Sequence, residues 1–113
     1  MKTITNINSD NDDVSIYIME EHGNAFCELT YYENERHNMF LSNLNVSEHE
    51  RRKGMATELI SIVEDIAKQK GCKYLYLHVN DSTSWVADWY KRIGFITYKS
   101  NDDKSCEMFK ILI

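Results

Sequence analysis

The stretch Arg51-Arg52-Lys53-Gly54-Met55-Ala56 decides how this chain is organised. It stands between a strand-like run that ends at Val46 and an amphipathic helical run that begins at Met55. Successive backbone N–H groups at a helix start point to one spot, and the helix dipole favours an anion there. Gly54 lets the backbone approach a ligand closely, and Ala56 keeps a larger side chain out of the way. The pattern Arg-x-x-Gly-x-Ala therefore predicts a pyrophosphate site, although a solvated basic turn has the same composition.

Before this stretch, the side chains follow the period of β-strands. Apolar residues alternate with others from Val14 to Met19, and His22-Gly23-Asn24 and Glu33–Arg36 are turn signals. Three neighbouring runs with short turns predict an antiparallel meander, with a short strand ahead of it. The expected strands cover residues 2–7, 14–19, 25–32 and 37–46.

After this stretch, the period changes to that of a helix. Apolar residues recur at helical spacing from Met55 to Ile66, and Gly71 is well placed to end the helix. A second helix, capped by Ser82, Thr83 or Ser84, is expected to stop at Gly94, and residues 95–99 and 106–113 to form a hairpin.

The run between the two helices, residues 73–79, reads as a strand with bulky side chains on both sides, which predicts a central strand covered on each face. The predicted fold class is α/β (α+β). It has a mixed, mostly antiparallel sheet built from an N-terminal meander, a helix–strand–helix unit and a C-terminal hairpin, in a single domain of residues 1–113.

Composition narrows the classes of function. The net charge of −5 disfavours a nucleic-acid partner, and no apolar run is long enough to span a bilayer. The first residues lack the apolar core of a signal peptide, so we expect a cytoplasmic protein with no membrane partner. The three cysteines are widely spaced, and the spacing of His22, His37 and His49 does not suggest metal ligands, so neither a disulfide framework nor a metal site is expected.

Taken in order, the motifs resemble those of the GNAT superfamily of N-acetyltransferases, which use acetyl-coenzyme A (acetyl-CoA). Leu44-Asn45-Val46 stands five residues ahead of Arg51-x-x-Gly54-x-Ala56. The long helix and its strand follow, and Trp89-Tyr90-Lys91-Arg92-Ile93-Gly94-Phe95 matches the family's Tyr-x-x-x-Gly-Phe signature. The resemblance covers roughly residues 14–113. It implies an enzyme that transfers an acetyl group from acetyl-CoA to a primary amine by direct attack in a ternary complex.

The same resemblance implies roles for particular residues. Tyr90 would protonate the departing thiolate; the alternative is an amphipathic tyrosine buried at the sheet edge. Backbone groups at 44–46 would bind the pantetheine arm and polarise the thioester carbonyl at a β-bulge, while those side chains also fill the core. The implied coenzyme-binding set is Leu44, Asn45, Val46, Arg51, Arg52, Lys53, Gly54, Met55, Ala56, Thr57 and Thr83.

Three features depart from the family pattern. His78 stands where many relatives carry a glutamate base, and it is a base candidate; a structural histidine is the alternative, and Glu28 acting through water is a rival base. Thr83 replaces a common asparagine and could serve as a helix cap instead. Only 13 residues precede Val14, where relatives usually have two helices.

The acceptor groove is therefore expected to be open, for a protein or another large amine acceptor, or closed by a second subunit in a homodimer. A different class of function stays open as well: a non-catalytic acyl-CoA-binding or regulatory interaction module on the same fold.

Overall fold

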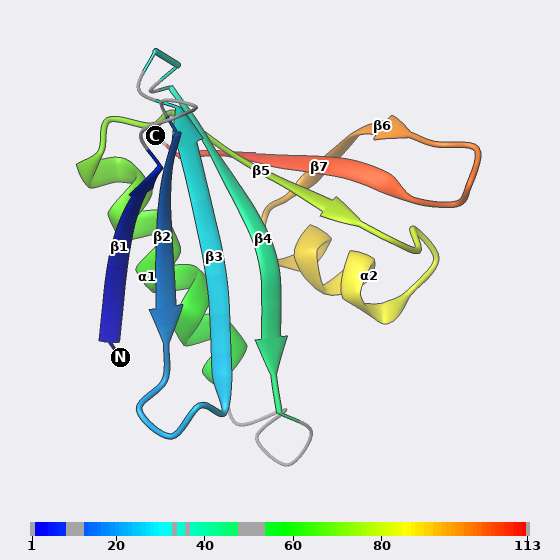
Figure 1. Cartoon of the computed structure of the whole chain (residues 1–113). Coiled ribbons are helices and arrows are strands. Elements are labelled where there is room, and N and C mark those ends of the chain that lie inside the picture. Colours follow the sequence, from blue (N-terminus) through cyan, green and yellow to red (C-terminus); the bar gives the residue numbers. More distant parts are fainter. Residues whose placement is uncertain (1, 9–12, 33, 36, 48–53, 113) are drawn as a thin grey trace.

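The computed structural model describes residues 2–8, 13–32, 34–35, 37–47 and 54–112, and within them the chain forms one seven-stranded sheet and two helices (Figure 1). The strands are β1 (Lys2–Asn8), β2 (Asp13–Met19), β3 (Ala25–Tyr32), β4 (Asn38–Val46), β5 (Tyr74–Val79), β6 (Ile96–Ser100) and β7 (Cys106–Ile111), and the helices are α1 (Met55–Gln69) and α2 (Trp85–Arg92). The predicted fold class is confirmed: a meander, a helix–strand–helix unit and a terminal hairpin follow one another along the chain.

The sheet opens between its two central strands. Its order is β1-β2-β3-β4-β5-β7-β6, and every neighbouring pair is antiparallel except β4 and β5. These two strands pair only from Asn38 with Tyr74 to Leu41 with Leu77. Beyond this point the second half of β4 diverges from β5, and α2 lies beside the gap (Figure 1). The second half of β4 is therefore not paired with β5.

An irregularity in β4 lies just past the end of this pairing. The register between β3 and β4 shifts between Phe26 and Glu28. On β4, Asn43 has a φ of 56°, in the left-handed region that asparagine tolerates better than most residues. Such a shift changes the direction in which the following residues, Leu44–Val46, point from the strand. The bulge that the family resemblance implies is thus present, and it begins at Asn43, which the sequence did not single out.

Both helices pack on the same face of the sheet. On β5, Leu75, Leu77 and Val79 are buried, and they share one hydrophobic cluster with residues from α1 and α2. The other side of β5 carries Tyr74, Tyr76 and His78, and no described helix covers it. The prediction that β5 is covered on both faces is therefore wrong. The two tyrosines bury part of their rings against neighbouring rings on the same face, which gives a bulky strand without a second helical layer.

Candidate functional site

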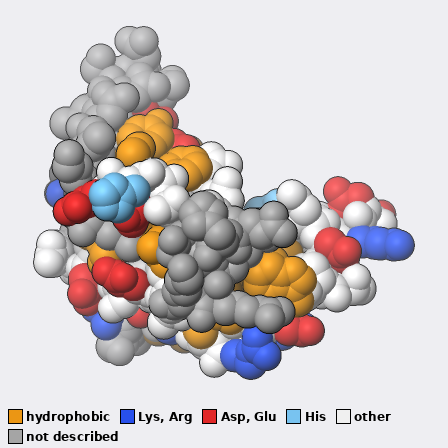
Figure 2. All heavy atoms as spheres, turned by 90° about the horizontal axis from the view of Figure 1, so that it is seen from below, with side chains coloured by type: hydrophobic (Ala, Val, Ile, Leu, Met, Phe, Trp, Pro, Cys, Tyr) orange, Lys and Arg blue, Asp and Glu red, His pale blue; other side chains and the backbone are white. Residues whose placement is uncertain are grey.

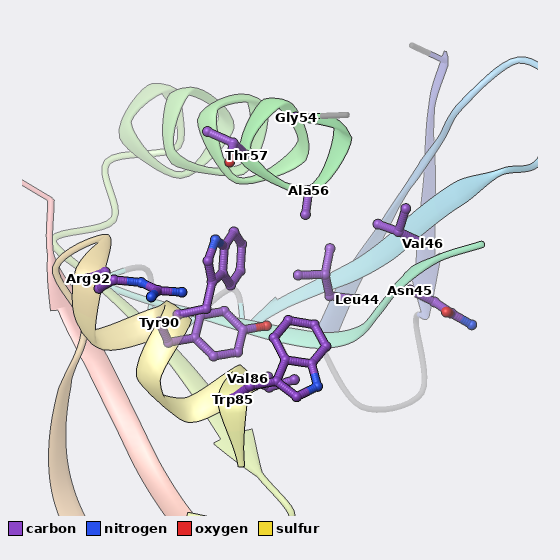
Figure 3. Close-up of a pocket in the computed structure, with 11 residues that line it drawn as sticks. Leu44, Asn45, Val46, Gly54, Ala56, Thr57, Trp85, Val86, Tyr90 and Arg92 are labelled. Atoms are coloured by element: carbon purple, nitrogen blue, oxygen red, sulfur yellow. The ribbon is translucent and has the colours of Figure 1, made fainter. Parts of the chain in front are cut away.

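A cleft of about 740 Å³ lies between the end of β4, the start of α1 and one side of α2 (Figure 3). Hydrophobic side chains reach the surface at this end of the molecule (Figure 2). The cleft is lined by Leu44, Asn45, Val46, Gly54, Ala56, Thr57, Trp85, Val86, Trp89, Tyr90 and Arg92. The fold thus brings together predicted site residues from three distant parts of the sequence.

Several predicted coenzyme-binding residues are not among those that line the cleft, and the structure gives different reasons for them. Arg51, Arg52 and Lys53 lie outside the described residues. Met55 is half-buried and packs against the core. Thr83 donates its hydroxyl proton to Asp81 Oδ1 at 2.6 Å. The cap of α2 is the neighbouring Ser84, whose Oγ accepts from the Ala87 N–H at 3.4 Å.

The start of α1 has the geometry of an anion site. Gly54 has a φ of 81° immediately before the helix, and its carbonyl accepts the Glu58 N–H at 2.9 Å. The N–H groups of the first helical turn have no partner within the helix, and here they lie at the cleft. Apart from its chain neighbours and its own helix, no described atom lies within 4 Å of where a Gly54 side chain would begin. The backbone conformation therefore favours glycine at this position.

Tyr90 stands at the centre of the site. Its side chain is buried, and its ring lies 5.1 Å from the Trp89 ring and 5.3 Å from the Phe95 ring between centroids. Burial raises the pKa of the phenol to about 12, so the hydroxyl keeps its proton at neutral pH. The hydroxyl points into the cleft toward Leu44, whereas the Asn45 side chain points away (Figure 3).

The Tyr-x-x-x-Gly-Phe signature has a structural reason in this fold. Gly94 adopts a φ of 108° after α2, and the following Phe95 N–H donates to the Tyr90 carbonyl at 3.0 Å. A side chain at Gly94 would meet the Lys110 stem at 3.0 Å. The signature therefore ends α2 and turns Phe95 back against the Tyr90 ring, which fixes the orientation of that ring.

A second pocket, of about 530 Å³, lies between β4, β5 and α2. Leu44, Val86 and Tyr90 line both this pocket and the first cleft. The residues that line only the second pocket are more polar and include Ser42, Asn43, His78, Asn80, Asp81 and Ser84. Tyr90 is thus shared by two cavities of different character.

In the second pocket, His78 is held by a carboxylate that the sequence analysis missed. His78 Nδ1 lies 2.5 Å from Glu107 Oε1, and the Asn101 side chain donates to Glu107 Oε2 at 2.6 Å. The hydrogen bond from His78 is the largest cause of a lowered pKa at Glu107. His78 and Glu107 face each other across β5 and β7. No pattern in the sequence indicates this pair, because it depends on which strand pairs with β5.

The rival base, Glu28, lies on the same sheet face but lines neither pocket. Its Oε2 accepts from the Asn43 side chain at 3.2 Å, and its negative charge raises the pKa of Tyr17. Among the described residues, no group of three or more His, Cys, Asp or Glu side chains is placed to hold a metal ion. None of the described helices is both long and apolar enough to cross a membrane.

A family model described as acetyltransferase (GNAT) family matches residues 3–95, which is most of the chain, so the chain belongs to this family. The expectation of an N-acetyltransferase is confirmed at this level. A comparison with curated protein sequences gave no match.

Several solved structures share the fold. Nourseothricin acetyltransferase matches with a TM-score of 0.74 and 18% identity, over 92% of this chain and 68% of that one. The ribosomal-protein-S18-alanine N-acetyltransferase from Escherichia coli matches with a TM-score of 0.68 and 18% identity, over 89% and 70%. A GNAT family acetyltransferase from Elizabethkingia anophelis, with acetyl-CoA bound, matches with a TM-score of 0.71 and 15% identity, over 89% and 77%. At these identities the likeness shows the fold alone.

Proposed function

We propose that this protein transfers an acetyl group from acetyl-CoA to a primary amine, by direct attack of the amine in a ternary complex. The observation that carries the proposal is the position of Tyr90, which lines both the cleft at the start of α1 and the pocket that contains His78. From this position the Tyr90 hydroxyl can give a proton to a leaving group in the cleft, while an amine is positioned in the pocket.

The cleft at the start of α1 suits the coenzyme. The N–H groups of the first turn and the Arg92 guanidinium offer positive charge to a pyrophosphate, with the predicted contribution of residues 51–53. The diverging backbone of Leu44–Val46 would bind the pantetheine arm. Acetyl-CoA would supply the activated thioester for the reaction.

The pocket on the other side suits the acceptor and its base. His78 lines this pocket, and its Nδ1 is engaged with Glu107, which leaves Nε2 to take the proton from the amine. Glu107 is a positioning residue in this proposal, because it holds the ring orientation and the tautomer of His78. Glu28 is the weaker candidate for the base because it does not line the pocket.

Tyr90 would donate its proton to the departing thiolate. Its raised pKa of about 12 keeps the phenol protonated, so a proton is available beside the leaving group. The only titratable thiol that influences Tyr90 in the described structure is Cys27, and burial raises the pKa of that thiol to about 12 as well. A thiol that stays protonated is a poor nucleophile, which supports direct transfer over an acyl-enzyme. The buried, unpaired cysteines also agree with the expected cytoplasmic location.

The test has two stages. Mass spectrometry of the purified protein under native conditions is expected to show bound coenzyme A or acetyl-CoA. Coenzyme A release is then measured with a panel of primary amines, and His78→Gln is compared with Glu28→Gln. We expect the His78 variant to lose far more turnover. Coenzyme binding without thioester cleavage by any amine would favour the non-catalytic binding module instead.

A further inference from the structure

The sheet face that no described helix covers carries most of the exposed large hydrophobic side chains in the described part of the chain. Seven large hydrophobic side chains in the described part of the chain are more than a third exposed, and six lie on this face by register and strand alternation. These six are Met19, Tyr32, Phe40, Ile96, Tyr98 and Ile111. An apolar surface of this extent on one face is typical of an interaction site.

Six rings on this face contact one another in a continuous group, here called the aromatic cluster. The Tyr76 ring at its centre stacks on Phe40 at 5.5 Å and on Phe109 at 6.0 Å between centroids. Tyr98 meets the Tyr76 ring edge-on at 5.7 Å. The cluster consists of Tyr32, Phe40, Tyr74, Tyr76, Tyr98 and Phe109, and so it extends over β3, β4, β5, β6 and β7.

The aromatic cluster runs directly into the pocket that contains His78. His78 lies two residues after Tyr76 on β5. Its partner Glu107 lies two residues before Phe109 on β7. On β4, Ser42 lines the pocket and stands two residues from Phe40. Residues two apart on a strand point to the same face. A molecule that lies on the aromatic cluster can therefore place one end in the pocket.

The charges around this pocket favour a cationic acceptor. Carboxylates surround it: Asp81 lines it, Glu107 binds His78, Asp103 interacts electrostatically with His78, and Glu28 stands opposite Ser42. The described cations nearby are Lys99, opposite Glu107, and Lys104, which interacts with Asp81. Aromatic faces attract ammonium and guanidinium groups, and the long stems of lysine and arginine pack along them.

We infer that the aromatic cluster binds an extended polypeptide segment rich in lysine and arginine, and that one amine of this segment enters the His78 pocket as the acetyl acceptor. The inference rests on the proposed function and names its acceptor class. A small amine would occupy the pocket alone, whereas the cluster continues across five strands away from it. A second copy of this chain would bring its own net charge of −5 and would cover the approach to His78.

Binding is measured first, without turnover, in the presence of coenzyme A. The ligands are a short unstructured peptide with one lysine between arginines, the same peptide with glutamates in place of the arginines, and spermidine. We expect NMR shifts of the Tyr76, Tyr98 and Phe109 ring signals with the arginine peptide and not with the glutamate peptide. Phe40→Ser and Tyr98→Ser should each weaken the arginine peptide about fivefold. Met19→Ser is the control, because it removes exposed apolar surface on the same face, at the opposite end of β2 and β3 from Tyr32.

The outcomes separate this inference from the proposed function. Equal binding of the two peptides, or ring signals that no peptide moves, would overturn the inference even if small amines are acetylated. The inference would also be overturned if spermidine were acetylated better than the arginine peptide. A dimer seen by light scattering, with the ring signals protected within it, would overturn it as well. If no amine releases coenzyme A but the arginine peptide still moves the ring signals, the binding surface stands and the acetyl-transfer proposal fails.

Discussion

The two cavities that share Tyr90 differ in charge and in how they are built. The cleft at the start of α1 is lined by the first residues of that helix, by Arg92 and by mostly apolar side chains. The pocket on the other side contains His78 and Asp81, with carboxylates around it. The first arrangement suits an anion. Because main-chain groups at a helix start can bind an anion whatever the side chains are, many different sequences can form such a site. The second depends on individual side chains, so it is where acceptor choice would be set.

Replacing Tyr90 with phenylalanine removes the hydroxyl group of the side chain that lines both cavities. Phenylalanine keeps the ring packing against Phe95 but has no proton to donate. We expect turnover to fall by about 100- to 10,000-fold, with coenzyme affinity almost unchanged. Steady-state rates with a working acceptor and calorimetric titration of coenzyme A provide the two measurements. Equal turnover in the two proteins, with chemistry rate-limiting, would remove Tyr90 from the mechanism.

The acceptor side is tested by Glu107→Gln. Glutamine keeps the shape of the contact with His78 but removes the negative charge that the lowered pKa of Glu107 maintains at neutral pH. We expect about a tenfold loss of kcat, since the tautomer of His78 is no longer fixed. Steady-state rates with a working acceptor measure this loss.

Asn101→Ala gives the matching control for that prediction. It removes the hydrogen bond to the second Glu107 oxygen and keeps the charge, so we expect a smaller loss of kcat than in Glu107→Gln. An unchanged kcat in Glu107→Gln would mean that Glu107 serves only the packing of β7 against β5.

The coenzyme side is tested by a pair of glycine variants. Gly54 and Gly71 flank α1, both with a φ of 81°, and beyond their immediate neighbours no described atom lies within 4 Å of an added Cβ. Valine should therefore cost a similar folding free energy at either position, roughly 1–2 kcal/mol. Only Gly54 lines the cleft, so only Gly54→Val should weaken coenzyme A, by about tenfold. Thermal unfolding and calorimetry give the two numbers; a similar loss of affinity in both variants would place the coenzyme elsewhere.

The sequence predicted the first cavity much better than the second. The meander, the helix ends and the positions of Leu44–Val46, Gly54 and Tyr90 follow from local periods, glycines and one family signature. Glu107 could not be found in this way, because its role depends on the register between β5 and β7. The aromatic side chains of β5 were expected to be covered by a further layer. Single-sequence periodicity shows that a face is bulky, but it does not show what lies on it.

The smallest expected effect concerns Trp85, the most exposed of the large hydrophobic residues described, at 66%. It lines the cleft from α2, beside Tyr90 (Figure 3). A bound coenzyme would cover part of this indole, so we expect Trp85→Ser to weaken the binding of coenzyme A by about threefold and to leave kcat with saturating coenzyme unchanged.

Fluorescence sharpens the test, since Trp89 is the other tryptophan and lies one helical turn away in a half-buried position. Coenzyme A should change the emission of the unmodified protein more than that of Trp85→Ser. If the change is the same in both, the coenzyme passes along Trp89 and the exposed indole has no part in coenzyme binding.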